Sequence, residues 1–340
     1  MSAHLELKQL SKIFGPRAGD GLSALRRGMS KTELLESSGH VLGVHDVNLH
    51  IERGELFVIM GLSGSGKSTL LRMINRLVTP SAGKVMLDGI DVTAMSGRAL
   101  VELRRRRMSM VFQSFALLPH LSVIDNVAFG LLVAGIEKKQ ARQRAAEALQ
   151  LVGIADVADH RPDQLSGGMR QRVGLARAWV TECEIMLMDE AFSALDPLIR
   201  TEMQDALLGL QQTARRTIVF ISHDLSEAVR IADRIAVMAE GSIRQVGTPT
   251  EIIQDPADDY VRAFFRDVRT GHLFTAGDIA VPGAVPDGIE PVAATALLDD
   301  ILPRAAASEV PLPVADEQGN IIGCIDRGRL LQALARGRTA

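Results

Sequence analysis

One stretch near the start of the chain, Gly61-Leu62-Ser63-Gly64-Ser65-Gly66-Lys67-Ser68-Thr69, has the spacing G-x-x-x-x-G-K-[ST] of a phosphate-binding loop. Glycines let the backbone curl so that successive N–H groups point inward at a triphosphate. We expect the Lys67 ammonium to reach the β- and γ-phosphates and the Ser68 hydroxyl to ligate Mg²⁺. A glycine-rich turn with a surface lysine is the alternative, but chance alone gives four such fixed positions in on the order of one per cent of chains this long. The stretch therefore predicts nucleotide binding by Gly61, Ser63, Gly64, Ser65, Gly66, Lys67, Ser68 and Thr69.

Two adjacent carboxylates, Asp189 and Glu190, end the apolar run that starts at Ile185. A buried strand delivers its last residues to the carboxyl edge of a parallel sheet, beside the phosphate loop. There we expect Asp189 to hold Mg²⁺ through water, and Glu190 to orient and polarise the attacking water. Phosphoryl transfer needs mainly positioning and charge neutralisation, so these groups and Lys67 suffice. Solvated acids at an ordinary strand end would look the same in isolation, but downstream of a phosphate loop they predict these roles in phosphoryl transfer.

A third motif, Leu165-Ser166-Gly167-Gly168-Met169-Arg170-Gln171, precedes an apolar helical pattern. Ser166 fits a helix N-cap, and the two glycines expose backbone N–H groups to an anion. A capped helix start without a ligand is the alternative. The pattern LSGG-x-[RQ]-Q resembles the signature of ABC-type ATPases.

Further segments match that family in order. Gln113 lies where the family has its glutamine loop, Asp196 ends the match to its D-loop, and His223 matches the switch histidine that contacts the γ-phosphate. Phe14 occupies the place of the aromatic that stacks on adenine, with a core aromatic at a strand end as the alternative. The resemblance implies catalytic roles for Glu190, His223, Lys67 and Gln113, metal contacts from Ser68, Gln113 and Asp189, and nucleotide contacts from Phe14, Ser166, Gly167, Gly168 and Asp196.

The resemblance also implies a homodimer in which two copies sandwich two ATP molecules. Each site would join Lys67 and Glu190 of one chain to Ser166 and Gly168 of the other. The signature loop can donate N–H groups but has no metal ligand or base of its own, which agrees with a nucleotide site shared between two chains. ATP would hold the dimer together, and hydrolysis would release it.

Closer matches indicate a subfamily. Residues 115–120 and 122–126 resemble importers, in which this surface receives a short helix from a membrane subunit. Residues 191–203 and the insertion at 15–40 look like the ATPases of glycine betaine/L-proline and choline importers. This implies import of a compatible solute with a quaternary amine, with membrane permease subunits as direct partners and an external solute-binding protein as an indirect one. It also implies a peripheral location at the cytoplasmic face of the cell membrane.

Two other functions stay open. A soluble ABC ATPase of DNA repair or translation usually carries a long coiled-coil insertion or a second ATPase half, and neither pattern is evident. A sensor whose tail detects a nucleotide or ionic strength and gates the ATPase could coexist with transport.

Composition supports a sizeable core. Of the 340 residues 46% are hydrophobic and only 4% aromatic, so the core should be aliphatic. The net charge of −3 gives no electrostatic reason to expect nucleic acid as a partner. Cys183 and Cys324 have no metal-binding spacing and suggest a reducing compartment. The apolar stretch 127–136 is too short to span a bilayer, and the N-terminus lacks the features of a signal peptide.

The elements that must position these residues follow from periodicity. Strands at 4–14, 41–51 and 56–60 are separated by the surface insertion 15–40, and the helical subdomain covers about 97–165. Alternating helices and strands from 168 to 238 predict a mainly parallel sheet covered on both faces. Arg104 to Arg107 are expected to form a solvated face before a strand at 108–112. The fold class is therefore α/β, a P-loop ATPase core with a helical subdomain, and the ATP-binding domain is expected to span 1–268.

The tail differs in character. Gly, Pro, Ala and Asp crowd residues 269–290, which predicts a linker, and 291–340 resembles a single regulatory module of the cystathionine-β-synthase (CBS) type. Residues 310–326 would supply its hairpin and 327–334 its helix, with Asp326 as the helix cap. The family usually carries two modules in tandem, and Asp326 and Arg329 replace residues that commonly hold adenosine. Our hypothesis is that the single module pairs with its copy across the dimer, the alternative being a tail that merely packs.

Overall fold

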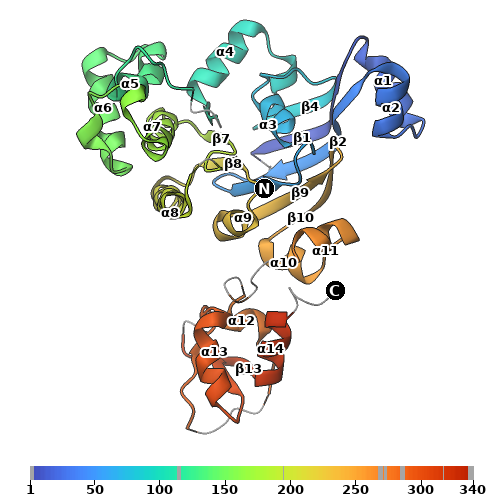
Figure 1. Cartoon of the computed structure of the whole chain (residues 1–340), viewed down its shortest axis with the longest axis vertical. Helices are drawn as coiled ribbons and strands as arrows, with labels where there is room; N and C mark the ends of the chain where they lie inside the picture. Colours follow the sequence, from blue (N-terminus) through green and yellow to red (C-terminus); the bar gives the residue numbers. More distant parts are fainter. Residues whose placement is uncertain are drawn as a thin grey trace. The chain divides into compact units, whose positions relative to one another are not determined.

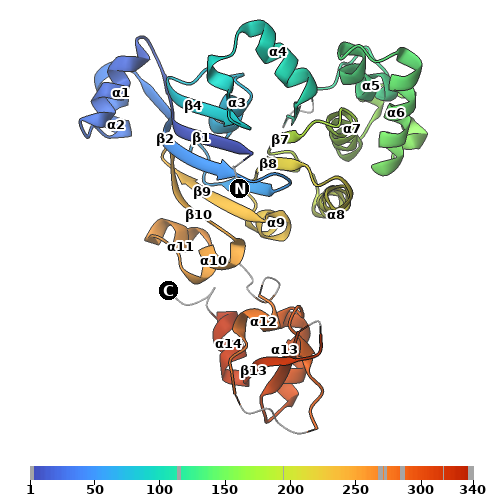
Figure 2. The same ribbon diagram turned by 180° about the vertical axis from the view of Figure 1, so that it is seen from behind.

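The computed structural model describes residues 4–112, 116–193, 195–266, 271, 274–283, 288–316 and 318–335. The chain divides into two compact units, Met1–Val246 and Gly247–Ala340, and each is considered by itself. Figure 1 shows the elements of both units, and Figure 2 shows them from behind. In the described part of the chain, no helix has the length and apolar character needed to cross a bilayer.

A six-stranded sheet forms the centre of the first unit, in the order β10-β9-β3-β8-β7-β6. Its pairs from β9 to β6 are all parallel, as the alternation of strands and helices predicts. The inner strands β3, β7 and β8 are buried at every position, which is typical of a parallel sheet covered on both faces. The strands are β3 (Leu56–Met60), β6 (Met108–Val111), β7 (Ile185–Asp189), β8 (Thr217–Ile221), β9 (Arg234–Ala239) and β10 (Ser242–Gly247).

A second, antiparallel sheet was not expected from the sequence. Its order is β2-β1-β4-β5, with strands β1 (Leu5–Phe14), β2 (Val41–Ile51), β4 (Ala82–Leu87) and β5 (Ile90–Asp91). Along much of β2, buried and less buried residues alternate, because one face of this sheet packs on the core and the other faces water. Helix α3 (Lys67–Ile74) contacts β2, β7 and β8, so the helix that follows the phosphate loop lies between the two sheets.

Helices α5 and α6 of the expected helical subdomain contact each other and α7, which begins just beyond it, and the three extend to one side of the sheet (Figure 1). Leu131 of α5 and Leu149 of α6 are buried in this group. The helices of the first unit are α1 (Ala18–Arg26), α2 (Lys31–Ser38), α3, α4 (Gly97–Arg106), α5 (Val123–Val133), α6 (Lys138–Leu151), α7 (Gly167–Trp179), α8 (Pro197–Ala214) and α9 (Leu225–Ile231), with short 3₁₀ turns at Val92–Ala94, Ala155–Val157 and Pro162–Gln164.

The insertion, residues 15–40, folds as α1 and α2 on the ends of β1 and β2. Leu34 is buried together with Ala24, and they pack against Ile13 of β1 and Leu42 of β2. Phe14 and Val41, which flank the insertion in the sequence, pair with each other in the β1–β2 ladder. The insertion therefore has a small core of its own, attached to the antiparallel sheet.

The arginine run 104–107 is only partly the solvated face that was expected. Arg105 and Arg106 are exposed, but Arg104 and Arg107 are half-buried. The Arg104 Nε donates a 2.8 Å hydrogen bond to the carbonyl of Asn75, and the Arg107 Nε donates one of 2.8 Å to Glu184. The prediction was wrong for these two because their partners come from distant parts of the chain.

The second unit has a three-stranded sheet of order β11-β12-β13, in which β11 and β12 are parallel and β12 and β13 antiparallel. The expected hairpin and final helix are present, and the Asp326 side chain accepts the N–H of Arg329 at 2.8 Å, as predicted for a cap. The elements are α10 (Pro249–Gln254), α11 (Asp259–Phe264), α12 (Ala276–Ile279), β11 (Val292–Ala293), α13 (Leu298–Ala307), β12 (Leu312–Ala315), β13 (Ile321–Ile325) and α14 (Arg327–Ala335).

Part of the segment expected to be a linker belongs to the core of this second unit. Phe274, Ala276 and Ile279 are buried against residues of β11, α13, β12 and α14. The Gly- and Pro-rich composition around residue 283 concealed this apolar cluster.

Candidate functional site

The phosphate loop joins buried strand β3 to helix α3, and two of its glycines, Gly61 and Gly66, stand where no side chain fits. Gly61 has a φ of +146°, and a Cβ there would lie 2.0 Å from the carbonyl oxygen of Met238. Gly66 has a φ of +102°, and its Cβ would lie 2.1 Å from the carbonyl oxygen of Gly43. Two neighbouring strands thus press against the loop and hold it in its curled form.

Lys67 is held at the centre of the loop. Its side-chain nitrogen donates to the carbonyls of Gly61 at 2.8 Å and Leu62 at 3.0 Å, and the residue is 5% exposed. Burial lowers the pKa of Lys67, while the nearby charges of Glu190 and Asp189 act in the opposite direction. A cation whose hydrogen-bond partners among the described residues are two carbonyl oxygens suits an incoming phosphate, which would supply negative charge at hydrogen-bonding distance.

The Ser65 hydroxyl gives an independent sign of an anion site. Its oxygen is buried and has no hydrogen-bond partner among the residues the structure describes. A buried hydroxyl without a partner costs free energy, and a phosphate oxygen would satisfy it.

Ser68 and Asp189 bring two hard oxygen ligands together, as the sequence predicted. The Ser68 hydroxyl donates to Asp189 Oδ1 at 2.8 Å, and Asp189 is only 2% exposed. Hydroxyl and carboxylate oxygens are the ligand type that Mg²⁺ prefers, so the residues present fit this ion. The other carboxylate oxygen accepts a 3.1 Å hydrogen bond from Arg72, a residue that sequence reasoning missed. Its position four residues after Ser68, on the same face of α3, was the available signal.

Glu190 and His223 face each other across neighbouring strand ends. Asp189, the last residue of β7, pairs with Ile221, the last residue of β8, so the residues that follow are adjacent. The His223 Nδ1 lies 3.6 Å from Glu190 Oε2. Glu190 has a φ of +47°, an uncommon conformation that turns the chain directly after the strand.

A buried network supports the loop that carries His223. The Ser222 hydroxyl donates to Glu227, which also accepts from Gln204 at 3.2 Å. Burial raises the pKa of Glu227, and these two hydrogen bonds partly oppose that effect. Asp224 caps α9 and accepts a 2.6 Å hydrogen bond from Arg200. These contacts fix the backbone on both sides of His223.

The signature segment lies at the start of α7. The Ser166 side chain caps this helix by accepting the N–H of Met169 at 3.2 Å. Asp196 caps α8 in the same way through Ile199, and a Cβ on Gly168 would lie 2.9 Å from Ile199 Cγ2. The structure thus brings the signature and the start of α8 together, whereas α7 is set apart from α3 in both views (Figures 1 and 2).

Phe14 is not the core aromatic of the alternative interpretation. Phe14 is 41% exposed. Its ring lies close to Gly43 and Thr69, because a Cβ placed on Gly43 would be 2.8 Å from Phe14 Cε2 and 3.3 Å from Thr69 Cγ2. The exposed ring therefore stands beside the first turn of α3, which begins with Lys67, Ser68 and Thr69. Gln113 and Phe115, which the sequence placed near the same nucleotide and at the importer surface, lie outside the described residues.

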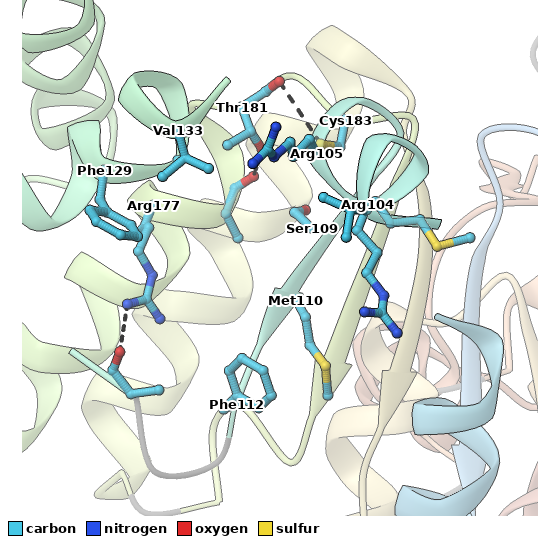
Figure 3. Close-up of a pocket in the computed structure, with 15 residues that line it drawn as sticks. Arg104, Arg105, Ser109, Met110, Phe112, Phe129, Val133, Arg177, Thr181 and Cys183 are labelled. Carbon is cyan, nitrogen blue, oxygen red and sulfur yellow. Dashed lines mark hydrogen bonds between the residues drawn. The ribbon is translucent and has the colours of Figure 1, made fainter. Parts of the chain in front are cut away.

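A groove of about 390 Å³ lies between α4 with β6 on one side and α5 with α7 on the other (Figure 3). Val101, Phe129 and Val133 expose apolar surface along it, and Arg104 and Arg105 lie at one wall. The guanidinium of Arg177 donates a 2.7 Å hydrogen bond to the carbonyl of Ala116. The groove is therefore apolar with basic edges.

The curled loop, the buried lysine and the paired carboxylates at the carboxyl edge of a parallel sheet define a P-loop ATPase with a helical subdomain. A family model described as "ABC transporter" matches residues 44–193. The chain belongs to the ATP-binding proteins of ABC transporters.

Known proteins of this family match most of the chain. It is 57% identical over 280 residues to the glycine betaine/proline betaine transport system ATP-binding protein ProV of Escherichia coli strain K12, covering 82% of this chain and 70% of that one. It is 44% identical over 333 residues to the trimethylamine N-oxide transport system ATP-binding protein TmoW of Ruegeria pomeroyi, covering 98% and 97%. A solved dimer of the ATP-binding cassette MJ0796 with ADP and phosphate superposes with a TM-score of 0.62 at 30% identity, over 72% of this chain and 98% of that one.

Proposed function

We propose that this chain is the ATP-hydrolysing subunit that energises import of a compatible solute of the glycine betaine, proline and choline class. The observation that carries the proposal is the convergence of Lys67, the Ser68–Asp189 pair and the Glu190–His223 pair on one sheet edge. The relatives named for glycine betaine, proline betaine and trimethylamine N-oxide transport share a fully methylated nitrogen in their solutes. We therefore expect a small methylated amine as cargo.

Each of these residues has a different role in phosphoryl transfer. The backbone N–H groups of Gly64 and Gly66, with Lys67, bind the β- and γ-phosphates. Ser68, Asp189 and Gln113 would hold Mg²⁺, which neutralises charge on the phosphates when bound. Glu190 orients and polarises the attacking water, and His223 contacts the γ-phosphate. Phe14 stacks on the adenine.

A second copy of the chain completes each site. Ser166, Gly167 and Gly168 begin a helix that stands apart from helix α3 of the same chain, so their N–H groups would serve a partner's nucleotide. Asp196 begins the helix packed beside them and would lie at the same contact. The solved relative MJ0796 is dimeric and holds ADP and phosphate, which supports this arrangement.

The groove between α4 and α5 is the proposed docking surface for a membrane permease subunit. Its apolar floor and basic edges suit a short helix with one apolar face and acidic flanks. Docking there would place the protein peripherally at the cytoplasmic face of the cell membrane, and an external solute-binding protein would act only through the permease.

Co-purification with the permease and measurement of ATPase activity against added solute test this function. The variant Phe129→Asp places a charge in the groove and should abolish both copurification and solute-stimulated hydrolysis, with basal ATPase activity retained. The matched control is Leu151→Asp, because Leu151 is an exposed apolar residue of the same subdomain outside the groove. Equal copurification and equal solute-stimulated hydrolysis in both variants would refute the docking surface.

The tail supplies a second candidate function, regulation. Residues 291–340 would form one CBS-type module, beyond an ATP-binding domain spanning 1–268 and the segment 269–290. The observation that favours it is a unit with its own apolar core that also exposes Ile321, Ile322 and Leu331. We propose that the module pairs with its copy across the dimer and senses a nucleotide or ionic strength. Deleting residues 269–340 should change the salt dependence of transport and weaken the dimer, and unchanged values of both would refute this role.

A further inference from the structure

The insertion between β1 and β2 carries a cation that reaches the phosphate loop. Lys31 is the first residue of α2, and its side-chain nitrogen lies 3.4 Å from the carbonyl oxygen of Gly64. Gly64 has a φ of +77°, and no atom would lie within 4 Å of a Cβ placed there. Lys31 therefore contacts the loop at a glycine that has open space beside it.

The start of α2 is fixed by local contacts. The Ser30 hydroxyl accepts the N–H of Glu33 at 3.2 Å, and Glu33 accepts the N–H of Ser30 at 2.8 Å. This capping box sets the first turn of the helix, and buried Leu34 attaches that turn to the small core of the insertion. The backbone of Lys31 is therefore held in place, with Gly64 within reach of its side chain.

Lys31 and Lys67 bind different carbonyls of the same loop. Lys67 takes those of Gly61 and Leu62, and Lys31 takes that of Gly64. The insertion that carries Lys31 begins directly after Phe14. A nucleotide with its base on Phe14 and its phosphates in the loop would thus be bordered by the insertion.

We propose that Lys31 is a nucleotide-positioning residue, which holds the phosphate loop at Gly64 and adds a second positive charge beside the bound phosphates. The inference rests on the ATPase function proposed above and extends it to a segment outside the shared family motifs. Lys31 makes no contact with the attacking water in this scheme, so it should affect binding of ATP and leave the chemical step unchanged.

The test compares Lys31→Met and Lys31→Arg in the full-length protein. We expect Lys31→Met to raise the Kd and KM for ATP roughly three- to tenfold, the range of one charge-assisted hydrogen bond, with kcat at saturating ATP unchanged. Lys31→Arg keeps the charge and should stay close to wild type. The control is Arg27→Met, which removes one exposed positive charge from the same insertion.

Each outcome decides between the alternatives. An unchanged Kd in Lys31→Met, with or without a lower melting temperature, overturns the inference, because a merely structural lysine would affect stability alone. An equal rise in Arg27→Met also overturns it, since the effect would then be a general one of net charge. Failure of the wild-type protein to bind ATP would instead refute the proposed function.

Discussion

The Ser68 hydroxyl donates a 2.8 Å hydrogen bond to Asp189, although 121 positions separate the two residues in the sequence. Helix α3 presents the serine and strand β7 delivers the aspartate to the same sheet edge. Arg72 occupies the second carboxylate oxygen at 3.1 Å, so this nearly buried charge is fully paired. The catalytic edge is thus assembled with a carboxylate already oriented toward the phosphate loop.

Removing the charge of Asp189 should impair metal use without unfolding the protein. Asp189→Asn keeps an oxygen that can accept from Ser68, but it loses the anionic ligand, so we expect Mg²⁺-dependent ATPase activity to fall at least about 100-fold. The measurement is ATPase rate against Mg²⁺ concentration. Asp205→Asn is the control, because Asp205 also pairs with an arginine but at an exposed site on α8. Similar losses in both variants would contradict the assignment.

Glu190→Gln should separate binding from hydrolysis. The amide is similar in shape but cannot polarise water, so we expect the rate to fall about 10²- to 10⁴-fold while ATP binding persists. ATP should then trap a dimer, which size-exclusion chromatography would detect. Glu182→Gln is the matched control, since Glu182 also has a positive φ, of +52°, and lies outside the site. If Glu190→Gln hydrolyses ATP at the normal rate, the role given to Glu190 is wrong.

Phe14→Ala should weaken ATP binding while sparing the fold. Stacking of one base on an aromatic ring contributes about 1–3 kcal/mol, which corresponds to a rise in Kd of roughly five- to 100-fold. Phe14→Tyr keeps the ring and should bind nearly as the wild type does. Titration calorimetry with ATP makes the comparison, and Leu35→Ala controls for loss of an exposed apolar side chain from the insertion. Unaltered affinity in Phe14→Ala would exclude stacking at this ring.

The phosphate loop glycines allow a sharper test of packing. Gly64 and Gly66 both have positive φ, but only at Gly66 would a Cβ overlap a backbone carbonyl, at 2.1 Å. Gly64→Ala should therefore cost only the backbone strain, about 1–2 kcal/mol, whereas Gly66→Ala should displace the loop and abolish ATP binding. Chemical denaturation and ATP titration of the two variants provide the measurement. Equal effects would show that the close approach of Gly43 is not what requires glycine at 66.

Local patterns predicted most of this site because the relevant rules act over short distances. The glycine spacing determines the loop, and a buried strand determines where Asp189 and Glu190 emerge. The N-cap of α7 at Ser166 also depends only on adjacent residues. The closeness of Ser68 and Asp189 followed once the phosphate loop and the end of β7 were assigned to one sheet edge.

Contacts between distant segments could not be predicted in this way. Lys31 reaches Gly64 only because the insertion folds back over β1 and β2, and no periodicity in residues 15–40 specifies that direction. The antiparallel sheet was missed because strands 5–14 and 82–87 pair across the intervening β2 and β3. Arg107 was assigned to solvent because its partners Asp88 and Glu184 are remote in sequence.

That arginine belongs to an ionic cluster which should govern stability in acid. Partial burial raises the pKa of Asp88, but hydrogen bonds from His4 and Arg107 outweigh it, and the pKa falls from 3.8 to about 2. A lowered pKa in the folded state means that this contribution to stability is complete above about pH 4 and is lost as the pH falls toward 2. Asp88→Asn should remove it, with a loss of roughly 1 kcal/mol at pH 7 after allowance for solvent screening of a carboxylate that is about one-third exposed.

The measurement is the free energy of unfolding by urea between pH 2 and pH 7. The free energy of unfolding should decline below pH 4 more steeply for the wild type than for Asp88→Asn. In that range the Asp88 carboxylate takes up a proton when the protein unfolds, and the asparagine has no carboxylate to do so. Asp156→Asn, at an exposed carboxylate outside the cluster, should keep the wild-type slope. The same slope in wild type and Asp88→Asn would mean that His4 and Arg107 do not lower the pKa of Asp88 in the folded protein, and that the cluster contributes nothing to stability through this group.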